Sequence, residues 1–281
     1  YGLFVQERAE LLMLPDIAGY VGADTCGCLL AIRQDLREEI SLMIDIGTNG
    51  EMVLGNRERM VTCSTAAGPA FEGAKIECGM RGAAGAVDHV KYEDGKWNYT
   101  TVGNKPAVGL CGSGLIDLVA GLLDAGMLDE NGVLSSGQGK KDVFMLVPPE
   151  WAGNGRGVYL TQKDLGEVQL AKAAIAAGIR MLMERLGITE DDIGSVYIAG
   201  AFGNYMDSVS AGKIGLLPAT LVKKVKPVGN AAGEGAKIAL VNEKEMLEMD
   251  ELVRKIEFVE LAASADFQDH FIDELGFETG E

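Results

Sequence analysis

The sequence predicts an α/β (α+β) fold in which a mixed sheet is flanked by helices. Strand-like and helix-like segments alternate along most of the chain, and glycine marks each strand-to-helix junction. Hydrophobic residues make up 47% of the 281 residues, which is enough to build a large core. This length suits one large domain or two coupled lobes.

The first third of the chain predicts a helix followed by a strand meander. Residues 17–36 are rich in small residues and end as a helix. Short apolar runs then predict two or three strands, at residues 41–47, 51–55 and 59–64. Residues 65–80 predict a loop that enters a short helix or turn.

The middle of the chain predicts a hairpin, a helix and a loop-rich region. Residues 85–109 are typical of a hairpin with a polar turn near its centre. Residues 109–126 predict a helix, with Ser113 as a plausible N-cap and Gly126 at its C-terminal end. Residues 129–158 contain Gly and Pro throughout, so we expect loops there.

The strongest helix signal lies at residues 160–187. Apolar residues recur there at helical spacing, Thr161 or Asp164 can cap the N-terminus, and Gly187 can end the helix. Lys172 lies on the less apolar side of this helix, and we expect its side chain in solvent.

The last third of the chain continues the alternation. The segments that it predicts are a buried strand at 195–203, a short strand at 224–228, a helix at 230–242, an acidic helix, a strand at 256–261 and an amphipathic helix at 265–275.

Charge and hydropathy exclude several classes of function. The net charge is −17 and the pI is near 4.6, so this surface would repel a phosphate backbone, and we expect no nucleic-acid partner. No apolar run approaches the roughly 20 residues that cross a bilayer, and the N-terminus does not resemble a signal peptide. Because the chain begins without Met, we expect it to belong to a longer protein.

The cysteines and histidines show no spacing typical of a metal site. Five cysteines without regular spacing argue against a disulfide framework and for a reducing compartment, so we predict a cytoplasmic protein. Cys26 and Cys28 are separated by one residue and the others lie far apart, unlike zinc or iron–sulfur ligands. We expect the cysteines to be small buried apolar residues, and His89 and His270 to lie at the surface.

The stretch SLMIDIGTNGEMVLG, residues 41–55, carries the main functional signal. Its first strand ends at Asp45, and a turn of Gly47, Thr48, Asn49 and Gly50 leads into the next strand. Backbone N–H groups exposed in such a turn form a cradle for anions. Asp45 can hold a hydrated Mg²⁺ or orient an attacking water. An ordinary tight hairpin, with Gly for positive φ, explains the stretch equally well.

Two common nucleotide motifs do not fit this turn. The Walker pattern G-x-x-x-x-G-K-[ST] is absent around Asp45. The turn also leads into a strand rather than a helix, which excludes a dinucleotide fingerprint. Phosphate binding between two strands indicates a different superfamily.

The order of segments resembles the second lobe of the ATPase superfamily shared by actin, sugar kinases and the seventy-kilodalton heat-shock chaperones, which has a ribonuclease H-like fold. The hairpin at 41–64 is followed by AAGPAFEGA, the long helix, VYIAGAFG and VGNAAGEGAKIAL. This resemblance implies that residues 41–281 form the second ATPase lobe, with a phosphate hairpin, an adenosine motif and a second connecting helix. Residues 1–40 would end the preceding lobe and contain the first connecting helix.

A narrower resemblance is to the C-terminal portion of ATP-dependent reductive activators of corrinoid proteins. It rests on LPDIAGYVGADT, DIGTNGE, TAAGPAFEGA, GLCGSGLID, VQLAKAAI, YIAGAFGNYMD, VGNAAGEGA and ELAASADFQDHF, which together span nearly the whole chain. It implies an enzyme that uses ATP to return a Co(II) corrinoid to Co(I) by electron transfer. The implied partners are a corrinoid iron–sulfur protein or a methyltransferase corrinoid subunit, with a possible homodimer.

This chain departs from a whole family member in two ways. It has no ferredoxin-like cysteine set, so a [2Fe–2S] cluster is expected only in the full-length parent and not in this chain. It also lacks the first phosphate hairpin, so the first lobe is expected upstream. ATPase activity is therefore expected of the full-length protein, and activity of this part alone stays open.

The resemblance also implies the ligands ATP and Mg²⁺ and a set of site residues. Asp45 and Glu72 are expected to be catalytic, and Asp45 and Asp24 to hold the metal. Glu72 lies where related chaperones place an acidic residue near the ribose, whereas Asp24 either faces the phosphates or caps a helix. The nucleotide-binding residues implied are Gly47, Thr48, Asn49, Gly50, Gly68, Gly112, Ser113, Gly114, Gly200, Ala201, Gly203, Gly229, Asn230 and Gly233.

Alternatives remain for single residues and for the whole chain. Glu51 either pairs across the hairpin or takes part in chemistry beside the phosphates. The amides of residues 112–114 either attract an anion or belong to a plain helix start. One alternative function is an activase of 2-hydroxyacyl-CoA dehydratases, which bridge a [4Fe–4S] cluster by paired cysteines. The other is a docking module for a corrinoid protein that binds no nucleotide.

Overall fold

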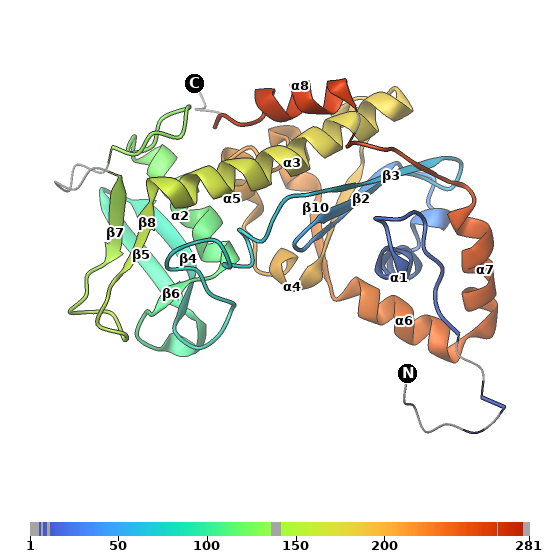
Figure 1. Ribbon diagram of the computed structural model, residues 1–281, viewed down its shortest axis with the longest axis horizontal. Helices are drawn as coiled ribbons and strands as arrows, with labels where there is room; N and C mark the ends of the chain where they lie inside the picture. The colour runs from blue at the N-terminus through green and yellow to red at the C-terminus, as the bar shows by residue number, and fades with distance from the viewer. Residues whose placement is uncertain (1–5, 7, 10–11, 136–141, 263, 278–281) are drawn as a thin grey trace.

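A computed structural model describes residues 6, 8–9, 12–135, 142–262 and 264–277 of the chain. Figure 1 shows two parts joined side by side. The right-hand part is a six-stranded sheet with helices on both faces, and the left-hand part contains two smaller sheets. In the described part of the chain, no helix is long and apolar enough to cross a membrane.

The six-stranded sheet is mixed, as predicted. β1, β2 and β3 form an antiparallel meander, β9 and β10 extend it in parallel beside β1, and β11 pairs in parallel with β3. This arrangement makes β1 a central strand, so residues at its end lie inside the molecule rather than at a sheet edge. In spatial order the strands are β10 (Val225–Gly229), β9 (Ser195–Ala199), β1 (Ser41–Ile46), β2 (Gly50–Gly55), β3 (Met60–Thr65) and β11 (Ile256–Phe258).

Helices cover both faces of this sheet. α1 (Ala23–Ile32) and α6 (Ala231–Val241) lie on one face and pack against each other, and α7 (Glu243–Val253) packs against both. α3 (Gln162–Leu186) lies on the other face against β2 and β3, and α8 (Ala265–Asp273) covers its outer side (Figure 1).

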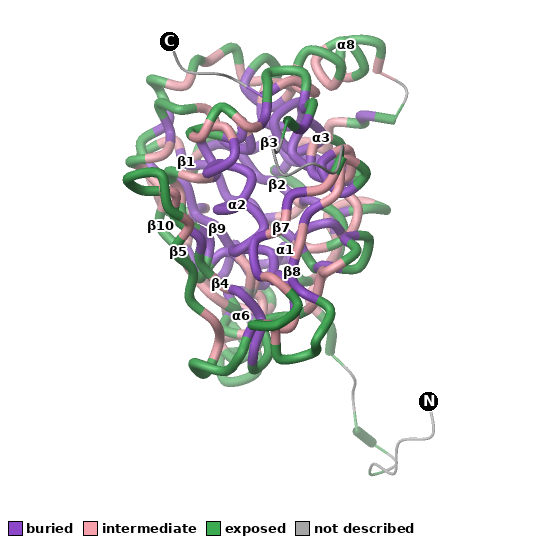
Figure 2. The backbone as a smooth tube through the Cα atoms, turned by 90° about the vertical axis from the view of Figure 1, so that its left-hand side faces the viewer, coloured by how far each residue is buried: buried purple, intermediate pink, exposed green. Residues whose placement is uncertain are grey.

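Alternate side chains of the central strands point into two separate hydrophobic cores. Met43 on β1 and Tyr197 on β9 point into the core beneath α1 and α6. Leu42 and Ile44 point into the larger core, which also contains Ile175 of α3 and extends into the left-hand part. Figure 2 shows this buried interior running through the strands. The period-two pattern thus decides which side chains of β1 face α1.

The left-hand part contains the predicted hairpin and helix. The hairpin strands are confirmed, and β6 pairs in parallel with β4. The described part of the region 129–158 is rich in loops, as expected, but the apolar run VFMLV within it forms β7 and pairs with β8. The elements of this part are β4 (Ala86–Glu93), β5 (Lys96–Thr101), β6 (Gly109–Leu110), α2 (Gly112–Asp124), β7 (Val143–Val147) and β8 (Val158–Thr161).

Several short helices complete the described structure. α5 packs against α2 and so joins the two parts of the molecule. The short elements are α4 (Gly200–Gly203), α5 (Ser208–Lys213) and 3₁₀ turns at Gln34–Leu36, Val102–Asn104, Glu190–Asp192 and Ala219–Lys224.

Helix starts were predicted with mixed success. Thr161 caps α3 in a capping box with Asp164, and Gly187 ends the helix at φ 69°, as expected. Ser113 as the N-cap of α2 was wrong, because the helix begins one residue earlier and Cys111 occupies that position. The Ser113 hydroxyl instead donates to the carbonyl oxygen of Asp88 at 2.8 Å.

Some boundaries differ from the predicted ones. The strand expected at 195–203 ends at Ala199, because Gly200 adopts φ +90° and begins α4. The strand expected at 256–261 ends at Phe258, and the first helix begins only at Ala23.

Lys172 is buried, and the expectation of a solvated side chain was wrong. Its side chain is 1% exposed because the segment after α8 covers this side of α3. The Lys172 Nζ donates to the carbonyl oxygen of Gly276 and lies 5.5 Å from the ring centre of Phe277. Gln169, one turn earlier, donates to the carbonyl oxygen of Leu275 at 3.0 Å. These contacts fasten the last described segment to α3.

His89 lies at the surface as expected, whereas His270 is less exposed than expected. His270 on α8 keeps only 13% of its side chain exposed and lies 2.9 Å from a carboxylate oxygen of Glu184. His89 is 46% exposed, and its Nδ1 lies 3.0 Å from a carboxylate oxygen of the buried Asp117. Both rings therefore connect neighbouring elements.

We expect Lys172→Ala to lower the free energy of unfolding by about 2–4 kcal/mol, because it removes a buried side chain and deprives the Gly276 carbonyl of a donor. Urea denaturation measures the change. Lys163→Ala is the matched control, since Lys163 is exposed on the same helix and its loss is expected to change stability by less than about 0.5 kcal/mol. Equal effects of the two substitutions would contradict a structural role for Lys172.

Candidate functional site

The turn between β1 and β2 keeps two backbone amides available. The Gly47 amide closes the turn by donating to the carbonyl oxygen of Asn49 at 2.9 Å. Within the described ranges, no acceptor takes a hydrogen bond from the amides of Thr48 or Asn49. Both residues are exposed, whereas Gly50 is buried in the strand. Of the predicted cradle, the amides of Thr48 and Asn49 are thus the ones whose N–H groups remain available for an anion.

The loop after β3 is fastened to this turn. The Gly68 amide donates to the carbonyl oxygen of Thr48 at 2.8 Å. The Thr48 hydroxyl donates to Glu72 at 3.0 Å, and a side chain on Gly47 would begin 3.8 Å from the same carboxylate oxygen. Glu72 therefore lies beside the turn itself.

Asp45 lies at the end of β1, held between two helices. A Cβ atom at Gly200 would lie 3.0 Å from the Asp45 Oδ1, so the start of α4 approaches the carboxylate closely. Gly200 also has φ +90°, which favours glycine. On the other side, the Cys28 thiol of α1 donates to Oδ2 at 3.7 Å. Burial, followed by the charge of Asp24, raises the pKa of Asp45.

Glu51 stands directly opposite Asp45 in the antiparallel register. Residues opposite each other point to the same face of a sheet, so both carboxylates lie on the α1 side. The Ser64 hydroxyl of β3 donates to Glu51 at 3.1 Å. Burial raises the pKa of Glu51, and the charges of Asp24 and Asp45 raise it further. The resolved ion pairs include none with these three acids, so negative charge accumulates here.

These acids do not form a complete metal site by themselves. Across the described residues, no group of three or more His, Cys, Asp or Glu side chains converges on a point that could hold a metal ion. Mg²⁺, however, is commonly bound by only one or two carboxylates together with water and phosphate oxygens. Asp45, with Asp24 nearby, fits that partial set of ligands.

The start of α4 lies against the loop after β3. Phe202 of α4 stacks on Phe71 with ring centres 5.5 Å apart. Gly203 packs so tightly that an added Cβ would lie 2.4 Å from Ile198 on β9. Ala201 lies between Gly200 and Phe202 on the same short helix. The predicted residues Gly200, Ala201 and Gly203 therefore share one helix, and Gly200 at its start lies next to the Asp45 carboxylate.

The start of α6 lies near the same helix. Gly229 ends β10 with φ +60°, and an added Cβ there would lie 3.0 Å from Asn204, which follows α4. Asn230 caps α6 by accepting from the Gly233 amide at 3.0 Å. Gly229 therefore lies against the end of α4, and Asn230 and Gly233 form the first turn of α6 beside it.

At the start of α2, of the three predicted residues only Gly112 lies against residues of the candidate site. A Cβ at Gly112 would lie 2.1 Å from the Phe71 carbonyl oxygen and 2.6 Å from the Phe202 ring. Gly114 packs against the carbonyl oxygen of Val87, and Ser113 is buried against β4. The prediction that Ser113 and Gly114 bind a nucleotide has no support in this arrangement, because both serve the contact between α2 and β4.

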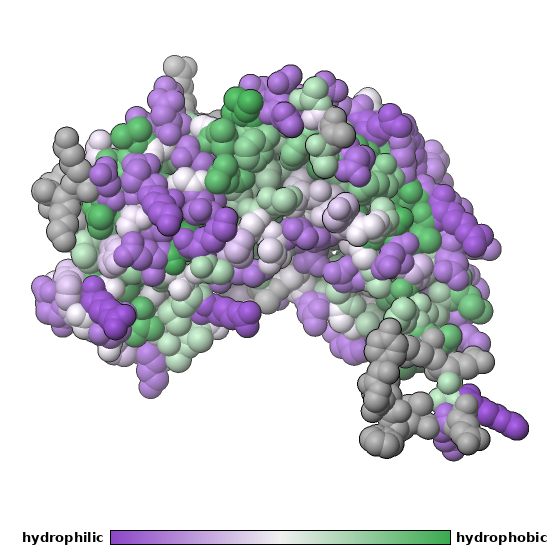
Figure 3. Space-filling view, viewed as in Figure 1, coloured by the Kyte–Doolittle hydropathy of each residue, from purple (hydrophilic) through white to green (hydrophobic). Residues whose placement is uncertain are grey.

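Figure 3 shows a concave notch at the lower edge of the molecule, between its two parts. In Figure 1 the helix α4 and the loop after β3 lie in the middle of the molecule, above this notch. The segments that carry the candidate site therefore meet where the surface is hollowed.

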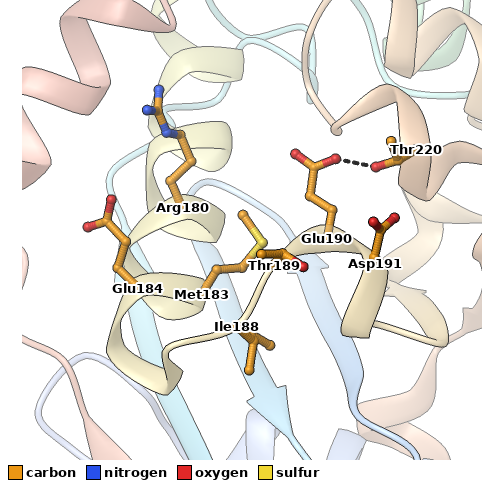
Figure 4. A pocket seen from close by; sticks show the side chains of 8 residues that line it. All are labelled: Arg180, Met183, Glu184, Ile188, Thr189, Glu190, Asp191 and Thr220. Atoms are coloured by element: carbon orange, nitrogen blue, oxygen red, sulfur yellow. Dashed lines mark hydrogen bonds between the residues drawn. The ribbon is translucent and has the colours of Figure 1, made fainter.

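A second hollow lies elsewhere. A shallow pocket of about 400 Å³ lies between the end of α3 and the segment 189–191. In Figure 4 the Glu190 carboxylate accepts a hydrogen bond from the Thr220 hydroxyl across this pocket. It contains none of the predicted site residues, so it is not the candidate site. Its lining consists of Arg180, Met183, Glu184, Ile188, Thr189, Glu190, Asp191 and Thr220.

The cysteines behave mainly as buried residues, as expected. Cys78 is partly exposed, and the other four are buried. Burial raises the pKa of Cys26 to about 12, and it raises the pKa of Cys28 and Cys63 more strongly. The thiolate is the reactive form, so these three thiols should be unreactive in the native state.

We expect iodoacetamide at pH 8 to label Cys78 at least roughly tenfold faster than Cys26, because exposure and thiolate character together set the rate. Mass spectrometry of the native chain at successive times measures both rates, and labelling after denaturation is the control. Equal native rates would show that the helix carrying Cys26 opens readily.

Sequence reasoning missed some residues of the site. The alternation of β1, β2 and β3 could have placed Ser64 beside Asp45 and Glu51, because all three share a face of the sheet. No sequence signal pointed to the contact of Cys28 with Asp45 or to the stacking of Phe71 on Phe202. Both contacts join elements far apart in the chain.

The strand–turn–strand cradle, the acidic end of β1, the short helix directly after β9 and the crossing helices α1 and α6 define an actin-like ATPase domain. The family model described as the C-terminal domain of RACo, the ASKHA domain, matches residues 39–281. The chain belongs to this family. The fold predicted from the order of its motifs is thereby confirmed.

Two curated relatives and one solved structure are similar to the chain. It is 36% identical over 283 residues to the corrinoid activation enzyme RamQ of Eubacterium limosum, which covers 95% of this chain and 47% of the relative. It is 29% identical over 296 residues to the reductase for Co(II) methylated amine-specific corrinoid protein of Methanosarcina barkeri, covering 97% of this chain and 52% of the relative. The chain thus spans about half the length of these relatives.

The solved structure is described as a reductive activator for corrinoid, iron-sulfur protein. It superposes with a TM-score of 0.88 at 40% sequence identity, covering 94% of this chain and 44% of that chain. Agreement at this level extends through both parts of the molecule.

Proposed function

We propose that this chain is the ATP-binding region of a reductive activator that restores Co(II) corrinoid proteins to Co(I) in methyl-transfer systems. The family match and the functions of the relatives support the corrinoid part of this proposal. The observation that carries the ATP-binding part is that the amides of Thr48 and Asn49, in the turn that follows Asp45, donate to no acceptor among the described residues.

The proposed site divides its tasks among segments. Phosphate oxygens accept from the amides of Thr48 and Asn49, because exposed amides at a turn attract anions. Asp45, with Asp24, would hold a hydrated Mg²⁺, and Glu72 orients polar groups beside the turn. The adenosine lies against α4 and the start of α6. Mg²⁺, when bound, would supply the positive charge that phosphoryl transfer requires.

The division into lobes belongs to the same proposal. Residues 41–281 form the second ATPase lobe, and residues 1–40 end the preceding lobe with α1 as the first connecting helix. The first phosphate lobe and an N-terminal [2Fe–2S] domain belong to the full-length parent. Nucleotide binding then closes the lobes and shifts the population toward the conformation that engages the corrinoid partner.

Titration calorimetry of this chain with Mg²⁺–ADP and a non-hydrolysable ATP analogue tests the nucleotide site. We expect saturable binding that requires Mg²⁺. Asn49→Pro removes one cradle amide and should weaken binding roughly tenfold, as expected for a charge-assisted hydrogen bond. Asp88→Asn is the control, because Asp88 is half-buried on β4 and faces Thr100 rather than the turn.

The possible results separate this proposal from the docking module. A flat titration with a folded chain would support a docking module that binds no nucleotide. Binding that is unaffected by Asn49→Pro would place the nucleotide elsewhere. Circular dichroism of each variant shows whether the chain remains folded.

The partner in this proposal is a corrinoid protein in the cytoplasm, with a possible homodimer of the activator. The charge of −17 favours a partner with a neutral or locally basic docking surface. Binding of a Co(II) corrinoid protein to the full-length activator, with and without the ATP analogue, tests it directly. We expect the analogue to change the affinity, and an unchanged affinity would argue against coupling.

A further inference from the structure

Cys28 lies at the point where three elements of the structure meet. It is fully buried on α1, next to the position where α1 crosses α6. An added Cβ at the neighbouring Gly27 would lie 2.7 Å from the carbonyl oxygen of Ala232 on α6. An added Cβ at Gly235 would lie 1.8 Å from the carbonyl oxygen of Gly27. The two backbones therefore touch, with no side chain between them.

The Cys28 sulfur connects this crossing to the end of β1. The thiol donates to the Asp45 Oδ2 at 3.7 Å. A cysteine thiol carries an S–H group that can donate a hydrogen bond. A continuous chain of contacts leads from α6 through α1 to the carboxylate.

The two oxygens of Asp45 face different neighbours. Oδ2 meets the thiol, whereas Oδ1 lies on the side where Gly200 begins α4. A carboxylate at the end of a strand has two rotatable bonds, so a contact on one oxygen sets the direction of the other. The thiol is the only hydrogen-bond donor to this carboxylate in the described part of the chain.

We propose that Cys28 is a positioning residue that aims the Asp45 carboxylate and ties its orientation to the crossing of α1 and α6. This inference rests on the proposed function of Asp45 in nucleotide binding. The thiol is fixed to α1, whereas the carboxylate is fixed to β1. A movement of α1 relative to α6 therefore changes the distance from the thiol to the carboxylate. The opening between the lobes is thereby linked to the orientation of Asp45, the residue proposed to hold Mg²⁺.

A matched set of variants distinguishes positioning from simple filling of the core. Cys28→Ala removes the donor, and Cys28→Ser keeps one. Cys26→Ala is the control, because Cys26 is equally buried on the same helix and has no contact with Asp45. We expect Cys28→Ala to weaken Mg²⁺–ADP binding roughly tenfold, with Cys26→Ala within about twofold of the unmodified chain. Cys28→Ser should bind nearly as tightly as the unmodified chain.

A double-mutant cycle shows whether Cys28 acts through Asp45. In an Asp45→Asn background, we expect Cys28→Ala to cause no further loss of affinity, since the contact it removes is already altered. Losses that add independently would overturn the inference, and so would equal losses from Cys28→Ala and Cys26→Ala.

An infrared measurement tests the contact without any nucleotide. We expect the S–H stretching band of Cys28, identified by its absence from Cys28→Ser, to shift when Asp45 is changed to Asn. An unchanged band would overturn the inference even if nucleotide binds. A shifted band in a chain that binds no Mg²⁺–ADP would overturn the proposed function, and with it the role of Cys28 in nucleotide binding.

Discussion

Changing Asp45 to Asn is expected to weaken Mg²⁺–nucleotide binding roughly 100-fold, as is typical when a residue that orients a metal is lost. The amide has nearly the shape of the carboxylate but carries no charge for the cation. Calorimetric titration of the variant with Mg²⁺–ADP measures the loss. Nucleotide affinity without Mg²⁺ should change little or improve, because a negative charge beside the phosphates has been removed.

The same substitution is expected to make the chain more stable. Burial and the charge of Asp24 raise the pKa of Asp45, so its ionised form destabilises the folded state. As pH rises from the ordinary pKa of Asp to the raised one, the folded chain retains a proton that the unfolded chain has released. The free energy of unfolding therefore falls over this window in the unmodified chain, and Asn removes that contribution.

Urea denaturation at pH 4 and pH 7 checks this sign. The stability of Asp45→Asn relative to the unmodified chain should be greater at pH 7 than at pH 4. A variant that loses stability at pH 7 would show that Asp45 supports the fold, and its loss of nucleotide binding could not then be assigned to the site.

Changing Gly235 to Ala is expected to lower the free energy of unfolding by about 3 kcal/mol, because overpacking forces two backbones apart. The new Cβ would lie 1.8 Å from the carbonyl oxygen of Gly27, and backbone cannot rotate away as a side chain can. The α1–α6 crossing must then separate, which also shifts Cys28. Thermal and urea denaturation measure the loss.

Gly166→Ala is the control for Gly235→Ala. Gly166 also lies inside a helix, α3, but nothing is within 4 Å of an added Cβ there. Alanine is the better helix former, so this variant should gain about 0.5–1 kcal/mol. If both substitutions raise the free energy of unfolding, the two backbones at the α1–α6 crossing can separate at little cost. The crossing then does not constrain the two helices.

Much of the fold could be predicted because hydrophobic patterning and capping are local. The strands at 41–64 and the helix that Thr161 caps follow directly from short apolar runs and from a capping box. Lys172 shows where this reasoning fails. Its surroundings come from a segment about a hundred residues later in the chain, so helical spacing alone placed it in solvent.

The site was predicted less completely than the fold. The turn and Asp45 were singled out because a strand that ends in an acid and then loses its side chains is unusual. Ser113 and Gly114 pack against β4, and a glycine needed for close packing looks the same in a sequence as one needed for a ligand. The contact of Cys28 with Asp45 depends on how α1 crosses the sheet, which no local pattern specifies.

The attachment of the loop after β3 has a mechanical consequence. The Gly68 amide donates to the carbonyl oxygen of Thr48. The Phe71 carbonyl oxygen lies so close to Gly112, in the first turn of α2, that there is no room for a side chain. A small shift of the β1–β2 connection is therefore passed on to α2 and, through its contact with β4, to the left-hand sheet. We therefore expect a ligand bound at the β1–β2 turn to displace the left-hand sheet as well.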